Sequence, residues 1–147
     1  SLIANSARAA GVLSGLAEQH LDALYRFGRQ LGLAFQVVDD ILDFTGSDQQ
    51  LGKPAASDLA SGYLTAPALY ALEERPALAG LIDREFSEEG DLAQALELVR
   101  GSNAIQRSRA LAEGFANEAR EALTWLPPSD SRAALLALPE FVLSRLY

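Results

Sequence analysis

The chain has 147 residues, 49% of them hydrophobic and 22% charged, a balance that is typical of folded proteins and excludes a disordered chain. The formal net charge is −8, with 20 acidic residues against 12 basic residues and no basic cluster, which argues against nucleic acid as a partner. The absence of cysteine excludes disulfides and thiolate metal sites, and no apolar run is long enough to span a membrane as a helix.

The first predicted elements are two helices separated by a glycine. Residues 2–16 are mostly small or apolar, and Arg8 is their one charged residue, which favours a closely packed helix. Gly15 ends this pattern, and a second helix is predicted over residues 18–44. The single histidine, His20, lies about five turns before the acidic residues discussed below, so we interpret it as solvated or capping rather than catalytic.

The segment of residues 45–61 is predicted to be a loop. Its residues Gly46, Gly52 and Pro54 break the helical periodicity, and loops of this length in compact domains are often functional. Lys53 lies in this loop, close behind the acidic residues. Two interpretations of Lys53 remain open from the residues alone, a contact to a phosphate group and an ordinary solvated lysine.

The remainder of the chain repeats an amphipathic helical pattern without strand-like alternation, so the predicted fold class is all-α, in a single domain over residues 1–147. Pro67 marks a helix start after Thr65, Asn103 is a candidate N-cap, and Pro139 is expected to kink or interrupt the last helix. The predicted helices are residues 65–74, 76–86, 91–100, 103–126 and 129–138.

In the helix predicted over residues 103–126, one face is apolar and the rest is charged. The expected core stripe is formed by Ile105, Leu111, Phe115, Ala119 and Ala122. The charged residues are assigned to solvated faces without chemistry; they are Arg107, Arg109, Glu113, Glu118, Arg120 and Glu121.

Three acids interrupt the apolar run of residues 31–44. In a helix Gln36, Asp39 and Asp43 share one face, and Asp40 lies on its flank. The neighbouring positions are apolar on nearly all sides, which predicts a buried helix. Like charges about 6 Å apart repel by roughly 3 kcal/mol at an effective dielectric constant near 20, so these acids suggest a bound cation rather than a solvated acidic turn. Oxygen ligands without His or Cys suit Mg²⁺ together with phosphate oxygens.

The stretch GLAFQVVDDILDF at residues 32–44 resembles the second aspartate-rich motif of the trans-isoprenyl diphosphate synthases. The resemblance continues in the same order through LGKP at 51–54, SDL at 57–59 and GYLTAP at 62–67. The LTAP variant and the C-terminal RLY are most similar to the long-chain branch of cyanobacteria and plastids, the solanesyl diphosphate synthases.

This resemblance implies an isoprenoid synthase-type helical bundle and a prenyltransferase that joins isopentenyl diphosphate to an allylic diphosphate by Mg²⁺-dependent 1′-4 condensation. It implies that Asp39, Asp40 and Asp43 hold Mg²⁺, that Lys53 contacts the allylic diphosphate, and that Gln36 lies beside the ionising substrate. The expected product is a long-chain polyprenyl diphosphate, solanesyl in particular. The implied localisation is the bacterial cytoplasm or the plastid stroma, and the expected assembly is a homodimer.

The family's first aspartate-rich motif is absent, and Tyr63 stands where many members have lysine. The chain also contains no methionine. We therefore expect it to be the C-terminal half of a polyprenyl synthetase domain, with the N-terminal half as its partner, so that the isolated chain would be inactive. Two alternatives are a non-catalytic prenyltransferase-like subunit that acts as a scaffold for a partner and a free-standing helical interaction domain.

Overall fold

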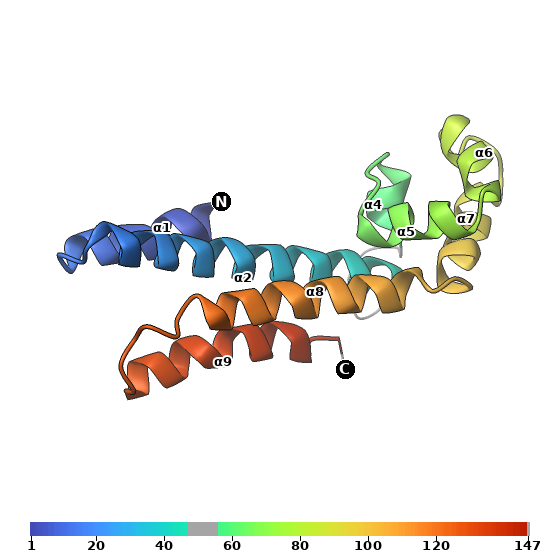
Figure 1. The fold of residues 1–147 in the computed structure, drawn as a ribbon. Helices are drawn as coiled ribbons and strands as arrows, with labels where there is room; N and C mark the ends of the chain where they lie inside the picture. Colours follow the sequence, from blue (N-terminus) through green and yellow to red (C-terminus); the bar gives the residue numbers. More distant parts are fainter. Residues whose placement is uncertain (47–55, 147) are drawn as a thin grey trace. The chain divides into compact units, whose positions relative to one another are not determined.

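In a computed structural model, residues 1–46 and 56–146 are described, and within these ranges every regular element is a helix, which confirms the all-α prediction. No helix in the described ranges is both long and apolar enough to cross a membrane. The helices shown in Figure 1 are α1 (Leu2–Leu13), α2 (Glu18–Thr45), α4 (Ser57–Ala60), α5 (Ala66–Glu74), α6 (Ala77–Asp83), α7 (Asp91–Arg100), α8 (Ala104–Glu121) and α9 (Asp130–Ser144).

The chain divides into two compact units. Unit 1 consists of Ser1–Val38 and Leu111–Tyr147, and unit 2 consists of Asp39–Ala110. Helices α2 and α8 therefore each contribute residues to both units. The expectation of one domain over residues 1–147 stays a prediction.

Unit 1 is built from long helices that approach one another closely. Helix α1, the first part of α2, the end of α8 and α9 run alongside one another (Figure 1). A Cβ atom on Gly28 of α2 would lie 2.6 Å from the backbone oxygen of Ile3 and 2.8 Å from the Cα of Ala4. Only glycine fits at this crossing, because real side-chain carbons do not approach backbone atoms so closely.

Unit 2 packs short helices around a core of its own. Helices α5, α6 and α7 contact one another, and the core extends to α4 and to the last turn of α2. Its fully buried large side chains include Phe44, Leu59, Leu78 and Val99. The last turn of the acidic helix is thus part of the hydrophobic core of unit 2.

Several predicted helix ends needed correction. Helix α1 ends at Leu13, before the turn in which Gly15 has a φ of +69°. Residues 57–60 of the predicted loop form α4. Helix α6 ends at Asp83, because Glu85 and Phe86 both have left-handed φ angles of 54°, which a helix cannot contain.

The last two helices also differ from the prediction. Helix α8 ends at Glu121, where hydrogen bonds such as Leu123 N–H to the Arg120 carbonyl tighten the chain into turns. Helix α9 continues through Pro139 to Ser144, so proline does not end it. Burial of Pro139 and Val142 offsets the hydrogen bond that proline cannot donate.

The core stripe of α8 is shifted from the one expected. Ala119 and Ala122 are buried as predicted, whereas Ile105, Leu111 and Phe115 are only half-buried. The fully buried positions of the helix are mostly small; they are Ala104, Ser108, Ala112, Ala116 and Ala119. Small side chains at the buried positions of a helix allow neighbouring elements to pack closely against it.

Candidate functional site

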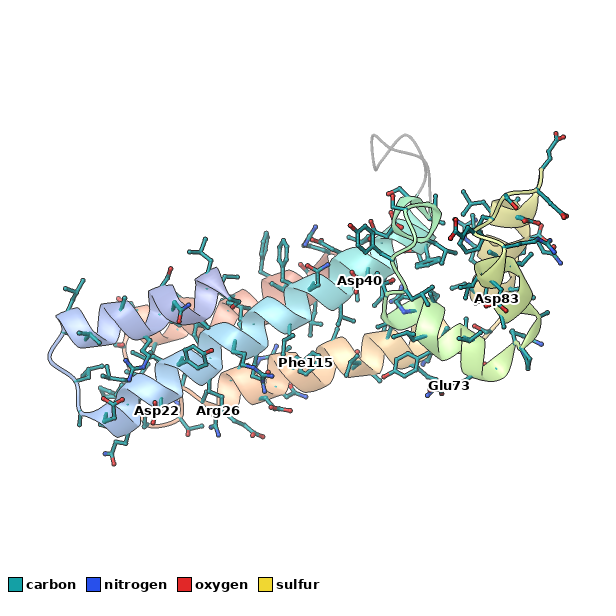
Figure 2. All side chains as sticks on the ribbon, turned by 90° about the horizontal axis from the view of Figure 1, so that it is seen from above. Asp22, Arg26, Asp40, Glu73, Asp83 and Phe115 are labelled. Atoms are coloured by element: carbon teal, nitrogen blue, oxygen red, sulfur yellow. The ribbon has the colours of Figure 1, made fainter. Side chains whose placement is uncertain are left out.

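The acidic stretch predicted from sequence lies in the last two turns of α2, where Figure 2 labels Asp40. Asp39 and Asp43 are one helical turn apart. They differ in environment, since Asp39 is half-buried whereas Asp43 is only 2% exposed and Asp40 only 7% exposed. Burial of two of the three acids agrees with the apolar flanks seen in the sequence.

Asp43 is held by the segment at the start of α4. Its Oδ1 accepts a hydrogen bond from the Ser57 hydroxyl, and its Oδ2 accepts one from the backbone N–H of Asp58, each at 3.1 Å. The Asp43 carbonyl accepts a third from the backbone N–H of Ala56 at 2.8 Å. Ala56 is the N-cap of α4 and offers no capping side chain, so the Asp43 carboxylate takes that role. The Ser57 hydroxyl and the Asp58 N–H satisfy a carboxylate that would otherwise be costly to bury.

The end of α2 is also held by α7. The Nε of Arg100 donates to the backbone carbonyl of Phe44 at 2.7 Å, across 56 residues of sequence. Phe44 itself is fully buried in the core of unit 2. The acidic turn is therefore fixed by packing and by hydrogen bonds from two other helices.

The other predicted site residues lie elsewhere in the chain. Gln36 is exposed and stands three residues before Asp39 on α2, within unit 1. Its neighbour Phe35 is 41% exposed, and the Arg145 guanidinium lies 4.7 Å from the centre of its ring. The exposure of Gln36 and Phe35 corrects the expectation that this helix is buried on nearly all sides. Lys53 lies outside the described residues.

The acids do not form a complete metal cage by themselves. Within residues 1–46 and 56–146, no group of three His, Asp or Glu side chains is arranged to hold a metal ion. Asp39 and Asp43 nevertheless offer carboxylate oxygens on adjacent turns. This donor set fits Mg²⁺, which commonly binds one or two carboxylates and completes its shell with water and phosphate oxygens.

Some residues to which the sequence assigned no chemistry connect helices instead. His20 is half-buried and stacks on Trp125 with ring centres 4.0 Å apart, a contact that the sequence did not predict. Arg107 forms an ion pair with Glu73 at 2.7 Å and lies over the Tyr70 ring. Glu118 accepts a hydrogen bond from the side chain of Gln30. Asn103 stands at the start of α8 as predicted, where its carbonyl accepts from Arg107 N–H at 2.9 Å.

Sequence reasoning missed the roles of Ser57 and Arg100. Ser57 belongs to the SDL segment that carries the resemblance, but its spacing from Asp43 does not reveal a hydrogen bond. Arg100 has no sequence signal, because its partner is a backbone carbonyl in a distant helix.

The described part of the chain is thus all-helical, and the acidic end of its α2 helix is held by hydrogen bonds from α4 and α7. The chain belongs to the polyprenyl synthetase family, whose model matches residues 1–99. The resemblance noted in the sequence is thereby confirmed.

Known relatives match over almost the whole chain. A prenyl transferase of Synechocystis is 57% identical over 147 residues, which are 100% of this chain and 46% of that protein. The chloroplastic solanesyl-diphosphate synthase 2 of Oryza sativa subsp. japonica is 48% identical over 99% of this chain and 36% of its own length. The chain thus spans less than half the length of these curated relatives.

A solved structure supports the isoprenoid synthase-type fold. The polyprenyl synthase of Caulobacter crescentus, complexed with calcium and isoprenyl diphosphate, has a TM-score of 0.86 and 36% identity to this chain. The match covers 99% of this chain and 46% of that one. That relative therefore holds a divalent cation together with a diphosphate compound.

Proposed function

We propose that this chain supplies one side of the site that binds the metal ion and the diphosphate in a long-chain trans-polyprenyl diphosphate synthase. The observation that carries the proposal is the pair Asp39 and Asp43 on adjacent turns of α2, one half-buried and the other anchored by Ser57 and Asp58. Family membership and the solanesyl relative support it. Solanesyl diphosphate is the proposed product, and a homodimer completed by the remainder of the family domain is the proposed assembly.

In this proposal the reaction begins when the C1–O bond of the allylic diphosphate breaks and its electron pair leaves with the diphosphate. The double bond of isopentenyl diphosphate then attacks C1, a new carbon–carbon bond forms, and a proton is lost. Bound Mg²⁺ would supply Lewis-acid stabilisation of the negative charge on the leaving diphosphate.

The residues of this chain have separate tasks in the proposal. Asp39 and Asp43 would hold Mg²⁺, with Asp40 beside them, and the hydrogen bonds to Asp43 orient its carboxylate. Lys53 binds the diphosphate. Gln36 turns its side-chain carbonyl toward the positive charge that develops on the allylic carbon.

The test uses a chimera in which residues 1–147 replace the matching segment of the Synechocystis prenyl transferase, which aligns over all 147 residues. We expect Mg²⁺-dependent elongation of farnesyl or geranylgeranyl diphosphate with isopentenyl diphosphate. Asp39→Ala should lower kcat/KM by about 10³-fold, since metal stabilisation of charge contributes several kcal/mol. Asp22→Ala, which removes an exposed acid from the first turns of the same helix (Figure 2), should leave the rate unchanged.

Near-normal turnover in Asp39→Ala would show that the metal role is wrong. A folded chimera without activity would instead favour the alternative of a non-catalytic scaffold. Lys53→Ala should raise KM for the allylic diphosphate, which tests the role of a residue outside the described ranges.

A further inference from the structure

We propose that Arg100 of α7 is a positioning residue for the acidic end of α2, an inference that rests on the function proposed above. It is argued from contacts within unit 2. Arg100 is exposed, and it lies 56 residues from the carbonyl that it contacts.

The end of α2 requires donors from outside the helix. The last carbonyls of a helix have no partner in the helix itself, and a buried carbonyl without a donor is costly. The Leu42 carbonyl accepts from Gly46 N–H at 2.8 Å, and the Asp43 carbonyl accepts from Ala56 N–H at 2.8 Å. The next carbonyl, that of Phe44, accepts from Arg100 Nε at 2.7 Å. Arg100 thus continues a series of donors that fix each of these three successive carbonyls.

This series bears directly on the acids. Phe44 follows Asp43 in sequence, and its side chain is fully buried, so its backbone has little freedom once the carbonyl is held. A shift of the Phe44 carbonyl would rotate the turn that carries Asp43 and change the distance from Asp43 to Asp39. The Arg100 contact therefore maintains the spacing of the two proposed metal ligands.

Arg100 also brings a positive charge to this end of the helix. The C-terminus of a helix has a partial negative charge, and three nearby acids add to it. If only the charge of Arg100 mattered, its removal would increase the affinity of the acids for a metal ion. If Arg100 instead positions Asp39 and Asp43, its removal would decrease that affinity. The sign of the change in metal affinity therefore separates the two effects.

Two substitutions isolate the hydrogen bond. The Nε2 of glutamine is four bonds from Cα, as is the Nε of arginine, so Arg100→Gln keeps a donor at the same reach but loses the charge. Arg100→Met removes both. Arg75→Met is the matched control, because Arg75 Nη2 donates at 2.7 Å to the carbonyl of Gly101, a residue of the same unit that is not part of α2.

The experiment measures Mn²⁺ binding to the chimera in the presence of inorganic diphosphate, from the electron paramagnetic resonance signal of free Mn²⁺. We expect Arg100→Met to weaken binding about tenfold, as loss of a residue that orients metal ligands typically does. Arg100→Gln should stay within about threefold of the unchanged chimera, and Arg75→Met should bind as the unchanged chimera does. The Mg²⁺ concentration for half-maximal activity should be highest in Arg100→Met, close to that of the unchanged chimera in Arg100→Gln, and unchanged in Arg75→Met.

Unchanged or tighter Mn²⁺ binding in Arg100→Met would overturn the inference, as would equal weakening in Arg100→Met and Arg100→Gln. Because Arg100 is exposed, both variants are expected to fold, which circular dichroism checks. If Asp39→Ala also binds Mn²⁺ normally, the proposed function itself is wrong. If Asp39→Ala loses binding and Arg100→Met does not, only the role of Arg100 is wrong.

Discussion

The two units of this chain are stabilised in different ways. In unit 1, long helices pack through backbone contacts such as Gly28 against Ile3, and through ring contacts such as His20 with Trp125. In unit 2, short helices are joined by side chains that bond to helix ends, as Asp43 does at α4 and Arg100 does at α2. Most of the chain's 20 acidic residues also lie in unit 2.

The difference follows from helix length. A long helix buries enough apolar surface to be held by packing, whereas a helix of four to ten residues has a large share of its backbone groups at its ends. Polar side chains satisfy those groups in unit 2. The same polar contacts hold carboxylates in fixed positions, which is what a metal and diphosphate site requires.

The largest effect is expected from two phenylalanines of α2 that lie in different units. Phe44→Ala should lower the free energy of unfolding by about 3–5 kcal/mol, because the ring is fully buried in the core of unit 2. Phe35→Ala, at a position 41% exposed in unit 1, should cost about 1 kcal/mol or less. Urea unfolding of the chain measures both values, and equal losses would contradict the assignment of Phe44 to the core.

The next effect concerns the helix crossing in unit 1. Gly28→Ala should lower the free energy of unfolding by about 1–3 kcal/mol, because the new Cβ would meet the backbone of α1. The control is Gly114→Ala in α8, where a Cβ would meet nothing within 4 Å. That change should stabilise the chain by up to about 1 kcal/mol through helix propensity. If both changes were stabilising, α1 and α2 would not cross so closely.

A smaller effect is expected at the anchor of Asp43. Ser57→Ala removes one hydrogen bond to Oδ1 and should lower the free energy of unfolding by about 0.5–1.5 kcal/mol. Ser144→Ala is the control, since that hydroxyl donates to the Phe141 carbonyl on an exposed turn of α9. Chemical unfolding of the two variants compares them, and a larger loss in Ser144→Ala would argue against a special role for Ser57.

The smallest effect is a dependence on pH in unit 2. Hydrogen bonds from the Arg84 guanidinium lower the pKa of Asp91 below its ordinary value and raise that of Arg84. The carboxylate is stabilised only when ionised, so its contribution is present above the ordinary pKa of aspartate and is lost as pH falls through the lowered pKa. The Arg84 side chain is 41% exposed, so solvent screens the pair.

We therefore expect Asp91→Asn to lower the melting temperature at pH 7. The further decrease in melting temperature on acidification below about pH 4 should be smaller in this variant than in the unchanged chain. Glu88→Gln is the control. The backbone N–H of residue 88 still donates to Asp91, and the carboxylate that is lost forms a long, exposed ion pair with Arg84 at 3.7 Å, which contributes little. Melting curves from pH 2 to 7 test this, and an unchanged acid profile in Asp91→Asn would show that the pair does not cause it.

Periodicity and turn residues predicted much of the fold. The range of α7 was predicted to the residue, and the start of α5 was recognised from Thr65 and Pro67. The helix ends that were wrong depended on other causes. The left-handed residues Glu85 and Phe86 have no local signal, and Pro139 lies within α9 as a fully buried residue, a burial that the local sequence does not reveal.

The helical class, the position of the acids on one helix and the resemblance to the polyprenyl synthetase family could all be predicted from the sequence alone. These properties depend on the spacing of residue types along a short stretch, which periodicity expresses directly. Only the folded structure reveals that Asp43 is buried and anchored while Asp39 is half-buried, and that Arg100 holds the end of their helix. Such contacts join residues 14 to 56 positions apart, and only the packing of the helices brings them together.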